Sequence, residues 1–275
     1  LMLPLVIGNV NNGQTNVVMA ALMIVATAAT TRQSWWMAAG CLTAAISLKM
    51  YPIALALLLA VLFPRPLIWR LALCLIVSVL LPFAMQRPEY VWQQYLDFVN
   101  YTPTDQRMEM PLADGNRDLW MLLRAWGVPM SVAGYRLLEL GTASGLAVIA
   151  WHLRRRKRAQ APALILALAT GWMLLCGPAT ESATYMLAGP IIALALTAAW
   201  TTPTSRGLRG VLTLSFVMLT LAQMAGWTPW TKNIHAWGLQ PAAVLLATGV
   251  GLLVALWPRA AADTAVSSAA WARAA

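Results

Sequence analysis

The sequence predicts an all-α integral membrane protein with about eight membrane segments. Its 275 residues are 60% hydrophobic and 10% charged, whereas a soluble domain carries about 25% charged residues. The apolar residues form long runs rich in Leu, Ala, Val and Met, much longer than the roughly 10-residue alternating segments of an outer-membrane barrel. The basic residues gather in short connections between these runs. We therefore interpret the net charge of +10 as a topological signal and expect no binding of nucleic acid.

The first three apolar runs are short. The first predicted span is Asn16–Thr31, and the next two runs, Trp35–Leu48 and Ile53–Phe63, flank a break at Lys49–Pro52. At 1.5 Å per residue each arm is roughly 15–20 Å long, less than the ~30 Å of a bilayer core. The proline favours an interruption. Two arrangements remain open: arms that meet below the membrane surface and leave a recessed pocket, or one long kinked span.

The next segments surround the longest hydrophilic stretch. Pro64–Arg70 is interpreted as a short basic loop and Leu71–Met85 as a span. Residues 86–130 form an outer loop that holds most of the acidic residues. Its aromatic residues predict an amphipathic helix at the membrane interface: Tyr90, Trp92, Tyr95, Phe98 and Tyr101.

The remaining apolar runs complete a single membrane domain over residues 1–258, followed by a polar cytoplasmic tail, 259–275. The expected spans are Ser131–Leu153, Ala161–Cys176, Ala183–Trp200, Gly210–Trp227 and Pro241–Trp257. The basic run Arg154–Arg158 is the strongest topological signal, and Arg206 and Arg209 mark a further inner loop.

The distribution of basic residues predicts the orientation. Eleven Lys and Arg fall in connections on one side and five on the other, where most of the acidic residues lie; the first side is therefore expected to be cytoplasmic. The polar groups around Gln14, Lys49 and Glu181, the 86–130 loop and the 227–240 loop then share the extracytoplasmic face. We expect a multi-pass protein of the inner or plasma membrane with its active face outward.

Four polar residues of the first half are candidate ligand contacts. Lys49 and Tyr51 offer a cation and a phenol for a lipid-linked phosphate; the alternative is a lysine that extends to the interface. Gln14 and Asn16 offer amide hydrogen bonds to sugar hydroxyls or phosphate oxygens. The alternative for both amides, and the favoured one for Asn16, is a helix cap.

Two further candidates lie on outer connections. Glu181, at a tight hairpin tip, is suited to binding acceptor hydroxyls or assisting proton transfer, or it simply keeps the tip in water. Arg117, within Asn116–Asp118, could clamp a phosphate, although helix capping by this group is the alternative. His152 and His235 have no second ligand at metal spacing, so we expect neither a metal site nor a cofactor.

These residues resemble the signature of glycosyltransferase family 87. Asn12–Asn16, Ala39-Gly40 and Ile46–Pro52 are similar to its Gly-Gln-x-Asn, Ala-Gly and Ile/Leu-Lys-x-x-Pro motifs. The segments Asn116–Leu119 with Leu122–Arg124, and Cys176–Pro190, resemble its later motifs.

The resemblance implies a membrane enzyme of the GT-C type, which moves a hexose, usually mannose, from a polyprenyl-phosphate donor to a lipid or glycan acceptor. It implies a donor site at Gln14, Asn16, Lys49 and Tyr51, with Glu181 as a weaker candidate. The family's catalytic aspartate precedes the Gly-Gln-x-Asn motif. Nothing before Gly13 matches it, so an N-terminally incomplete sequence is expected. The competing hypothesis is a secondary transporter with its substrate site at the broken helix; it predicts internal repeats, and the sequence has none.

Overall fold

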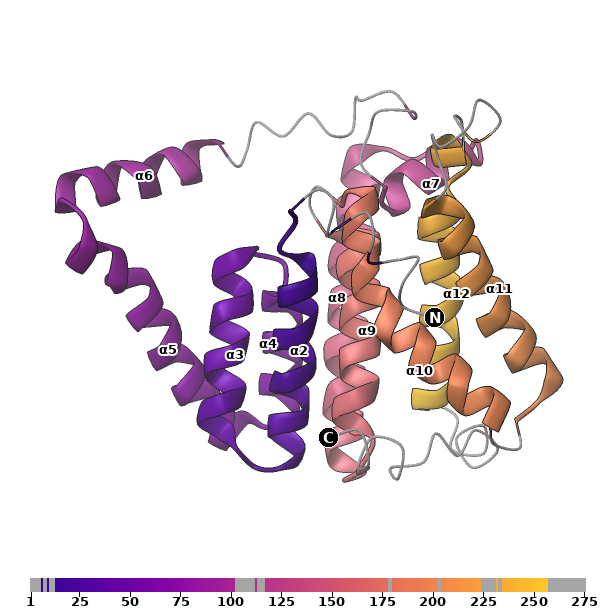
Figure 1. The fold of residues 1–275 in the computed structure, drawn as a ribbon, viewed down its shortest axis with the longest axis horizontal. Helices are drawn as coiled ribbons and strands as arrows, with labels where there is room; N and C mark the ends of the chain where they lie inside the picture. Colours follow the sequence, from indigo (N-terminus) through magenta and orange to yellow (C-terminus); the bar gives the residue numbers. More distant parts are fainter. Residues whose placement is uncertain are drawn as a thin grey trace.

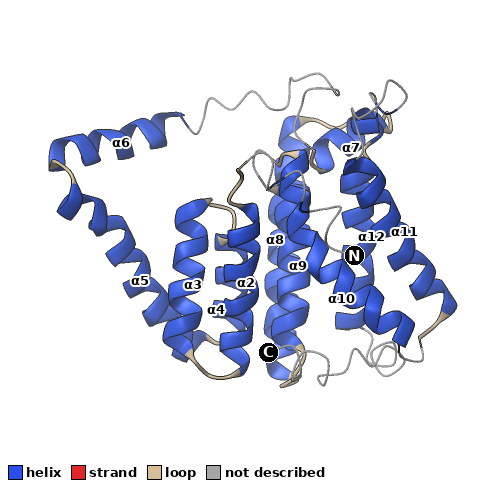
Figure 2. Ribbon diagram, in the orientation of Figure 1, coloured by secondary structure: helices blue, strands red, loops and turns tan. Residues whose placement is uncertain are grey.

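The computed structural model describes residues 6, 9, 13–101, 112, 117–177, 180–201, 204–223, 231 and 234–256. Within these ranges the regular structure is helical and contains no strands (Figure 2). Successive long helices run in alternating directions, so the connections lie at two opposite ends of the bundle (Figure 1). Parts of the expected 227–240 and 86–130 loops and the whole 259–275 tail lie outside the described residues.

Five helices lie in the described part of the N-terminal half. They are α2 (Asn16–Thr31), α3 (Trp35–Leu48), α4 (Ile53–Leu62), α5 (Pro64–Met85) and α6 (Pro88–Tyr101). The bounds of α2 and α3 agree with the sequence prediction. The short α7 (Leu119–Ala125) follows, with its start capped by the Asp118 carboxylate, which accepts from Met121 N at 2.9 Å.

The C-terminal half is built from α8 (Val132–Arg155), α9 (Ala161–Cys176), α10 (Ala188–Thr201), α11 (Arg206–Gln223) and α12 (Leu239–Leu256). Two short 3-10 helices, η2 (Ser182–Leu187) and η4 (Ile234–Trp237), lie at the same end of the bundle as α7. Within the described part of the chain, three stretches are long and apolar enough to cross a membrane: Pro64–Met85, Ser182–Thr201 and Leu239–Leu256.

The two short arms form an antiparallel hairpin. Trp35, at the start of α3, packs against Phe63, which follows α4, with ring centroids 5.2 Å apart. The break at 49–52 therefore lies at the tip of the hairpin, at the end of the bundle that also carries η2 and α7 (Figure 1). This excludes one long kinked span and leaves the arrangement in which both arms end at the break.

The expected basic loops at 64–70 and around Arg206 were wrong, because both segments begin helices. Pro64 stands at the first position of α5, where its missing N–H costs nothing. Arg70 remains helical by donating to Pro66 O at 2.6 Å and by stacking over the ring of Trp69 at 4.2 Å. Arg206 is the first residue of α11, which begins four residues before the expected start. The expected span at Ala183–Trp200 likewise begins as the 3-10 helix η2.

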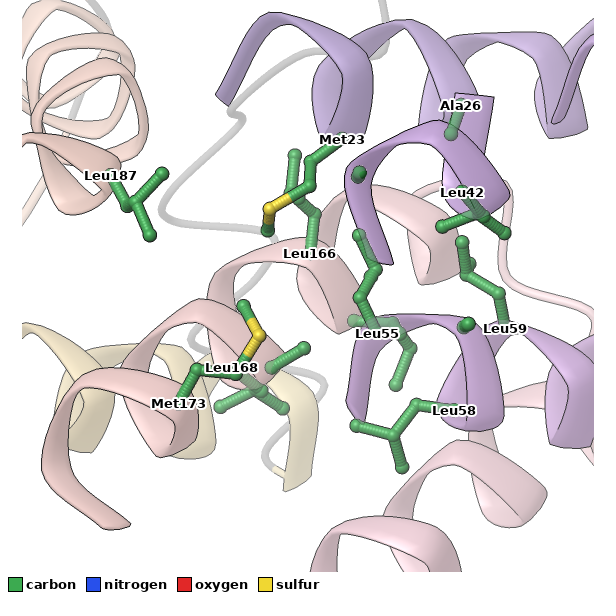
Figure 3. Packing of buried hydrophobic residues seen from close by; sticks show 14 of the residues in the cluster. Met23, Ala26, Leu42, Leu55, Leu58, Leu59, Leu166, Leu168, Met173 and Leu187 are labelled. Carbon is green, nitrogen blue, oxygen red and sulfur yellow. The ribbon is translucent and has the colours of Figure 1, made fainter. Parts of the chain in front are cut away.

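The core is formed where α2, α4, α9 and η2 meet. Met23 of α2, Leu55 of α4 and Leu166 of α9 are buried there, with Leu187 of η2 beside them (Figure 3). Three of the eight buried residues of α2 and three of the six buried residues of α3 are alanines. Small side chains let membrane helices approach closely, which strengthens the van der Waals contacts that drive their association.

Helices α5 and α6 extend away from this core (Figure 1). Only Leu67 and Leu71 of α5 are buried, and they lie in the half that packs on α3. Helix α6 returns across the end of α5, where the Tyr95 hydroxyl donates to Val79 O at 2.7 Å. Its Tyr90, Trp92 and Phe98 are exposed, as the prediction of an interfacial helix requires.

Candidate functional site

Three segments far apart in the sequence meet at one end of the bundle. They are the turn that precedes α2, the turn between α3 and α4, and the hairpin that leads into η2 (Figure 1). Each segment brings polar side chains.

Asn16 is at the centre of the α2 turn and is fully buried. Its Nδ2 donates to Asn9 Oδ1 at 2.8 Å and to Gln14 Oε1 at 2.6 Å. Thr15 precedes the helix without making a side-chain cap bond, and the Asn16 amide is engaged in the cluster. A helix cap accepts a hydrogen bond from a backbone N–H of the first turn. The Asn16 amide instead donates to two side chains, so Asn16 does not cap α2.

Asn9 fixes this turn to the η2 hairpin. It is buried, its Nδ2 donates to Ala183 O at 2.9 Å, and its carbonyl accepts from Gln14 N at 3.0 Å. Asn9 was not among the residues selected from the sequence. Its position among several asparagines before the Gly-Gln-x-Asn motif was the signal that could have found it.

Gln14 connects the α2 turn to Glu181. Gln14 Nε2 donates to Glu181 Oε2 at 3.1 Å, and its Oε1 accepts from Asn16. Glu181 is exposed and immediately precedes η2. The carboxylate thus has one oxygen held by an amide while the group stays accessible to a ligand.

Tyr51 brings the break between α3 and α4 into the same cluster. Its hydroxyl donates to Asn16 Oδ1 at 3.5 Å and shares a side-chain hydrogen bond with Thr184 of η2. Burial, aided by the nearby negative charge of Glu181, raises the pKa of Tyr51 to about 12, although the bond from Thr184 opposes this. Tyr51 is therefore a neutral hydrogen-bonding group at physiological pH.

Lys49 lies at the edge of this cluster. It is half-buried, and its Nζ is 5.9 Å from the centroid of the Tyr51 ring, within the range of a cation–π contact. Among the described residues no carboxylate forms an ion pair with it. A cation in this position is available to a phosphate.

Arg117 lies in a neighbouring buried cluster. Its Nη1 donates to Leu112 O at 2.7 Å, and its backbone N–H donates to Thr180 O at 2.6 Å. The Tyr185 hydroxyl donates to the Arg117 carbonyl. These bonds hold the segment before α7 against the residue that precedes Glu181, so the structure connects Arg117 to the candidate site through the hairpin backbone. Asn116 lies outside the described residues.

Gln240 of α12 supports the hairpin from the other side. It is buried, and its Nε2 donates to Ser182 Oγ at 2.7 Å and to Ser182 O at 3.3 Å. The sequence analysis did not single out this residue. A polar residue at the start of an apolar run on the same expected face was the signal that could have found it.

The lone histidines do not contribute a metal site to the described structure. His152 is in the last turn of α8, at the opposite end of the bundle from Lys49, and the side chain of His235 lies outside the described residues. Within the described ranges, no three His, Cys, Asp or Glu side chains gather closely enough to hold a metal ion.

The apolar helices run in alternating directions, and polar side chains gather at one end of the bundle. These features define a helical membrane protein with a polar site. The site offers one cation, one phenol, three amides and one carboxylate. The model of glycosyltransferase family 87 matches residues 1–178. The chain belongs to this family and is therefore a glycosyltransferase. Searches of curated proteins and of solved structures found no match.

The family match covers only part of the site. Gln14, Asn16, Lys49 and Tyr51 lie within the matched residues, whereas Glu181, η2 and Gln240 follow them. The C-terminal segments nevertheless contact the matched ones directly, through the Asn9–Ala183 and Gln14–Glu181 hydrogen bonds.

Proposed function

We propose that this glycosyltransferase moves a hexose, in the first instance mannose, from a polyprenyl-phosphate donor to a lipid or glycan acceptor. The protein would cross the membrane several times and work at its extracytoplasmic face. The observation that carries the proposal is the continuous set of contacts that leads from the Lys49 ammonium through Tyr51, Asn16 and Gln14 to the Glu181 carboxylate.

The cationic end of this cluster suits the donor phosphate. When the bond between the sugar C1 and the phosphate oxygen breaks, negative charge grows on the departing polyprenyl phosphate. A cation and preorganised hydrogen-bond donors near that oxygen stabilise the transition state. Lys49 supplies the cation and Tyr51 a neutral hydroxyl. Both lie at a hairpin tip whose arms, at roughly 15–21 Å, are shorter than the ~30 Å bilayer core, so we expect the tip to be recessed below the membrane surface.

The amides and the carboxylate suit the sugar and the acceptor. Gln14 presents an amide group beside the phosphate position and is held there by the buried Asn16 amide. Amides exchange hydrogen bonds with sugar hydroxyls. Glu181 lies at the exposed side of the cluster, where an acceptor would approach. A carboxylate there accepts the hydroxyl proton as the acceptor oxygen forms its new bond to C1 and the phosphate leaves.

The test is transfer of labelled mannose from polyprenyl-phosphate mannose to lipid in membranes that carry the protein from its complete reading frame. Lys49→Ala should reduce transfer by about 100-fold or more, the usual loss when one charge-stabilising donor is removed. Lys49→Arg, which retains the charge, should recover part of the activity.

The matched control is Lys157→Ala, which removes an exposed cation at the opposite end of the bundle and should leave transfer unchanged. Undiminished transfer in Lys49→Ala would remove Lys49 from the site while leaving the reaction intact. Absence of transfer from the mannose, glucose and arabinose derivatives of polyprenyl phosphate would overturn the donor class.

A further inference from the structure

A partly enclosed apolar cavity lies between α9, α10, α11 and α12. Its volume is about 120 Å³. Its lining includes Ala167 of α9, Ala195 of α10, Leu212 of α11 and Val254 of α12, and its few polar groups, such as Gln160 and Thr204, flank the starts of α9 and α11. These helix ends lie opposite the candidate site (Figure 1).

A second, smaller cavity continues the first along the bundle. The two share lining residues on α9, α10 and α12, among them Ala167, Ile192 and Gly251. The second cavity reaches Ala188, the first residue of α10. Gly171 of α9 and Thr248 of α12 also line it and approach closely, because a Cβ on Gly171 would lie 2.1 Å from Thr248 Oγ1. The two cavities together form an apolar space that extends along these helices.

The end of this space near the starts of α9 and α11 is positively charged. Arg158 Nη1 donates to Val254 O and Ala255 O at 3.3 Å, which fixes its guanidinium beside a lining residue. Arg206 is exposed and lies between the lining residues Thr204 and Leu208. The acidic side chains among the described residues all belong to other parts of the structure: Glu89, Asp97, Asp118, Glu139 and Glu181.

An apolar cavity beside cations suits an anionic lipid. Atoms that line an empty cavity lose the dispersion contacts of a packed interior, and in a bilayer the available apolar filler is a hydrocarbon chain. Basic pockets between membrane helices bind anionic head groups. We propose that an anionic phospholipid inserts part of one acyl chain into this cavity and that its phosphate lies against Arg158 and Arg206.

The proposal is separate from the transfer reaction, and its test measures lipid retention. The protein, purified in mild detergent, is mixed with phosphatidylglycerol or phosphatidylcholine and examined by native mass spectrometry. The wild type should retain one phosphatidylglycerol more strongly than phosphatidylcholine. Ala195→Phe fills the cavity and should reduce retention of both lipids by about tenfold, the factor that corresponds to roughly 1.4 kcal/mol of binding energy. Ala44→Phe adds the same volume on the exposed surface of α3 and should retain lipid as the wild type does.

The double variant Arg158→Gln/Arg206→Gln isolates the head group. It should lose the preference for phosphatidylglycerol while retaining phosphatidylcholine. If Ala195→Phe cannot be recovered from membranes, Ala195→Leu gives a smaller filling with the same expected direction.

Three results would overturn the proposal: no retained phospholipid on the wild type, equal retention in the filled variant, or displacement of phosphatidylglycerol by polyprenyl phosphate. The last would assign the cavity to the tail of the donor. None of these results depends on whether the donor assignment at Lys49 holds.

Discussion

Gln14 and Glu181 are separated by 167 positions in the sequence, and Gln14 Nε2 donates a 3.1 Å hydrogen bond to Glu181 Oε2. This bond joins the turn before α2 to the hairpin before η2. It also orients a carboxylate that is exposed at the edge of a polar cluster. Its strength and its role are both open to measurement.

Removal of this amide should impair transfer through Glu181. We expect Gln14→Ala to lower transfer about tenfold, because a hydrogen bond to a charged group contributes roughly 1.5–3 kcal/mol and 1.4 kcal/mol corresponds to tenfold in rate. If Gln14 acts by orienting the carboxylate, the double variant with Glu181→Ala should lose no more than Glu181→Ala alone. Gln93→Ala is the matched control, since Gln93 Nε2 makes a similar exposed bond to Asp97 on α6. Losses that add fully in the double variant would show that the two side chains act independently.

The Tyr51 hydroxyl should contribute equally to the rate of transfer at neutral and at alkaline pH. Its pKa is raised to about 12, so the phenol keeps its proton well above the value of about 10 of a free tyrosine. Tyr51→Phe should reduce transfer, and the ratio of wild-type to variant rates should stay constant from about pH 7 to about pH 10. A ratio that falls toward one as the pH approaches 10 would mean that Tyr51 ionises there and is not shielded as the structure indicates.

Gly177 should be intolerant of a side chain. A Cβ at this position would lie 2.0 Å from Met173 O at the end of α9. We expect Gly177→Ala to lower the free energy of unfolding by about 2 kcal/mol or more, seen as a reduced midpoint in thermal unfolding in detergent. Gly249→Ala is the control, since nothing lies within 4 Å of its Cβ position and alanine favours a helix by up to about 1 kcal/mol. Equal midpoints for the two variants would contradict the close contact at Gly177.

The proposed orientation can be tested with single cysteines. Met50, at the hairpin tip, is 52% exposed, and Lys157 lies exposed at the opposite end. In a background where Cys41, Cys74 and Cys176 are replaced by alanine, a membrane-impermeant maleimide should label Met50→Cys in intact cells. Lys157→Cys should react only after the membrane is permeabilised. The reverse pattern would place the site on the cytoplasmic face.

Much of the helical framework followed from the sequence alone. The bounds of α2, α3 and α9 match the expected runs because each run ends at residues that disfavour further helix or carry polar side chains. The predicted loop at Pro64–Arg70 was wrong for a specific reason. Arginines near a membrane interface can stay helical by stacking on aromatic rings, as Arg70 does over Trp69 and Trp36. A prediction that assigns the basic residues between apolar runs to loops therefore misplaces such arginines.

The candidate site was only partly accessible to sequence reasoning. Gln14, Asn16, Lys49, Tyr51 and Glu181 were selected as polar residues expected on one face, and the structure brings them together; their roles stay predictions. Asn9, Thr184 and Gln240 were missed, since their importance comes from bonds to residues distant in the sequence. Arg117 was selected as a candidate phosphate clamp with helix capping by its segment as the alternative; its backbone N–H bonds to Thr180 O, and its role at a ligand stays a prediction.

The sequence by itself determined that the chain is helical and apolar and that its polar residues cluster around a few breaks. These properties are set by local composition and by the cost of placing charge and unpaired backbone in a bilayer. The tertiary structure decided which breaks meet, that α3 and α4 form a hairpin, and that Asn16 donates within a cluster and does not cap its helix. The reason is that these outcomes depend on how helices pack side by side, and a local pattern of residues carries no information about partners more than a hundred positions away.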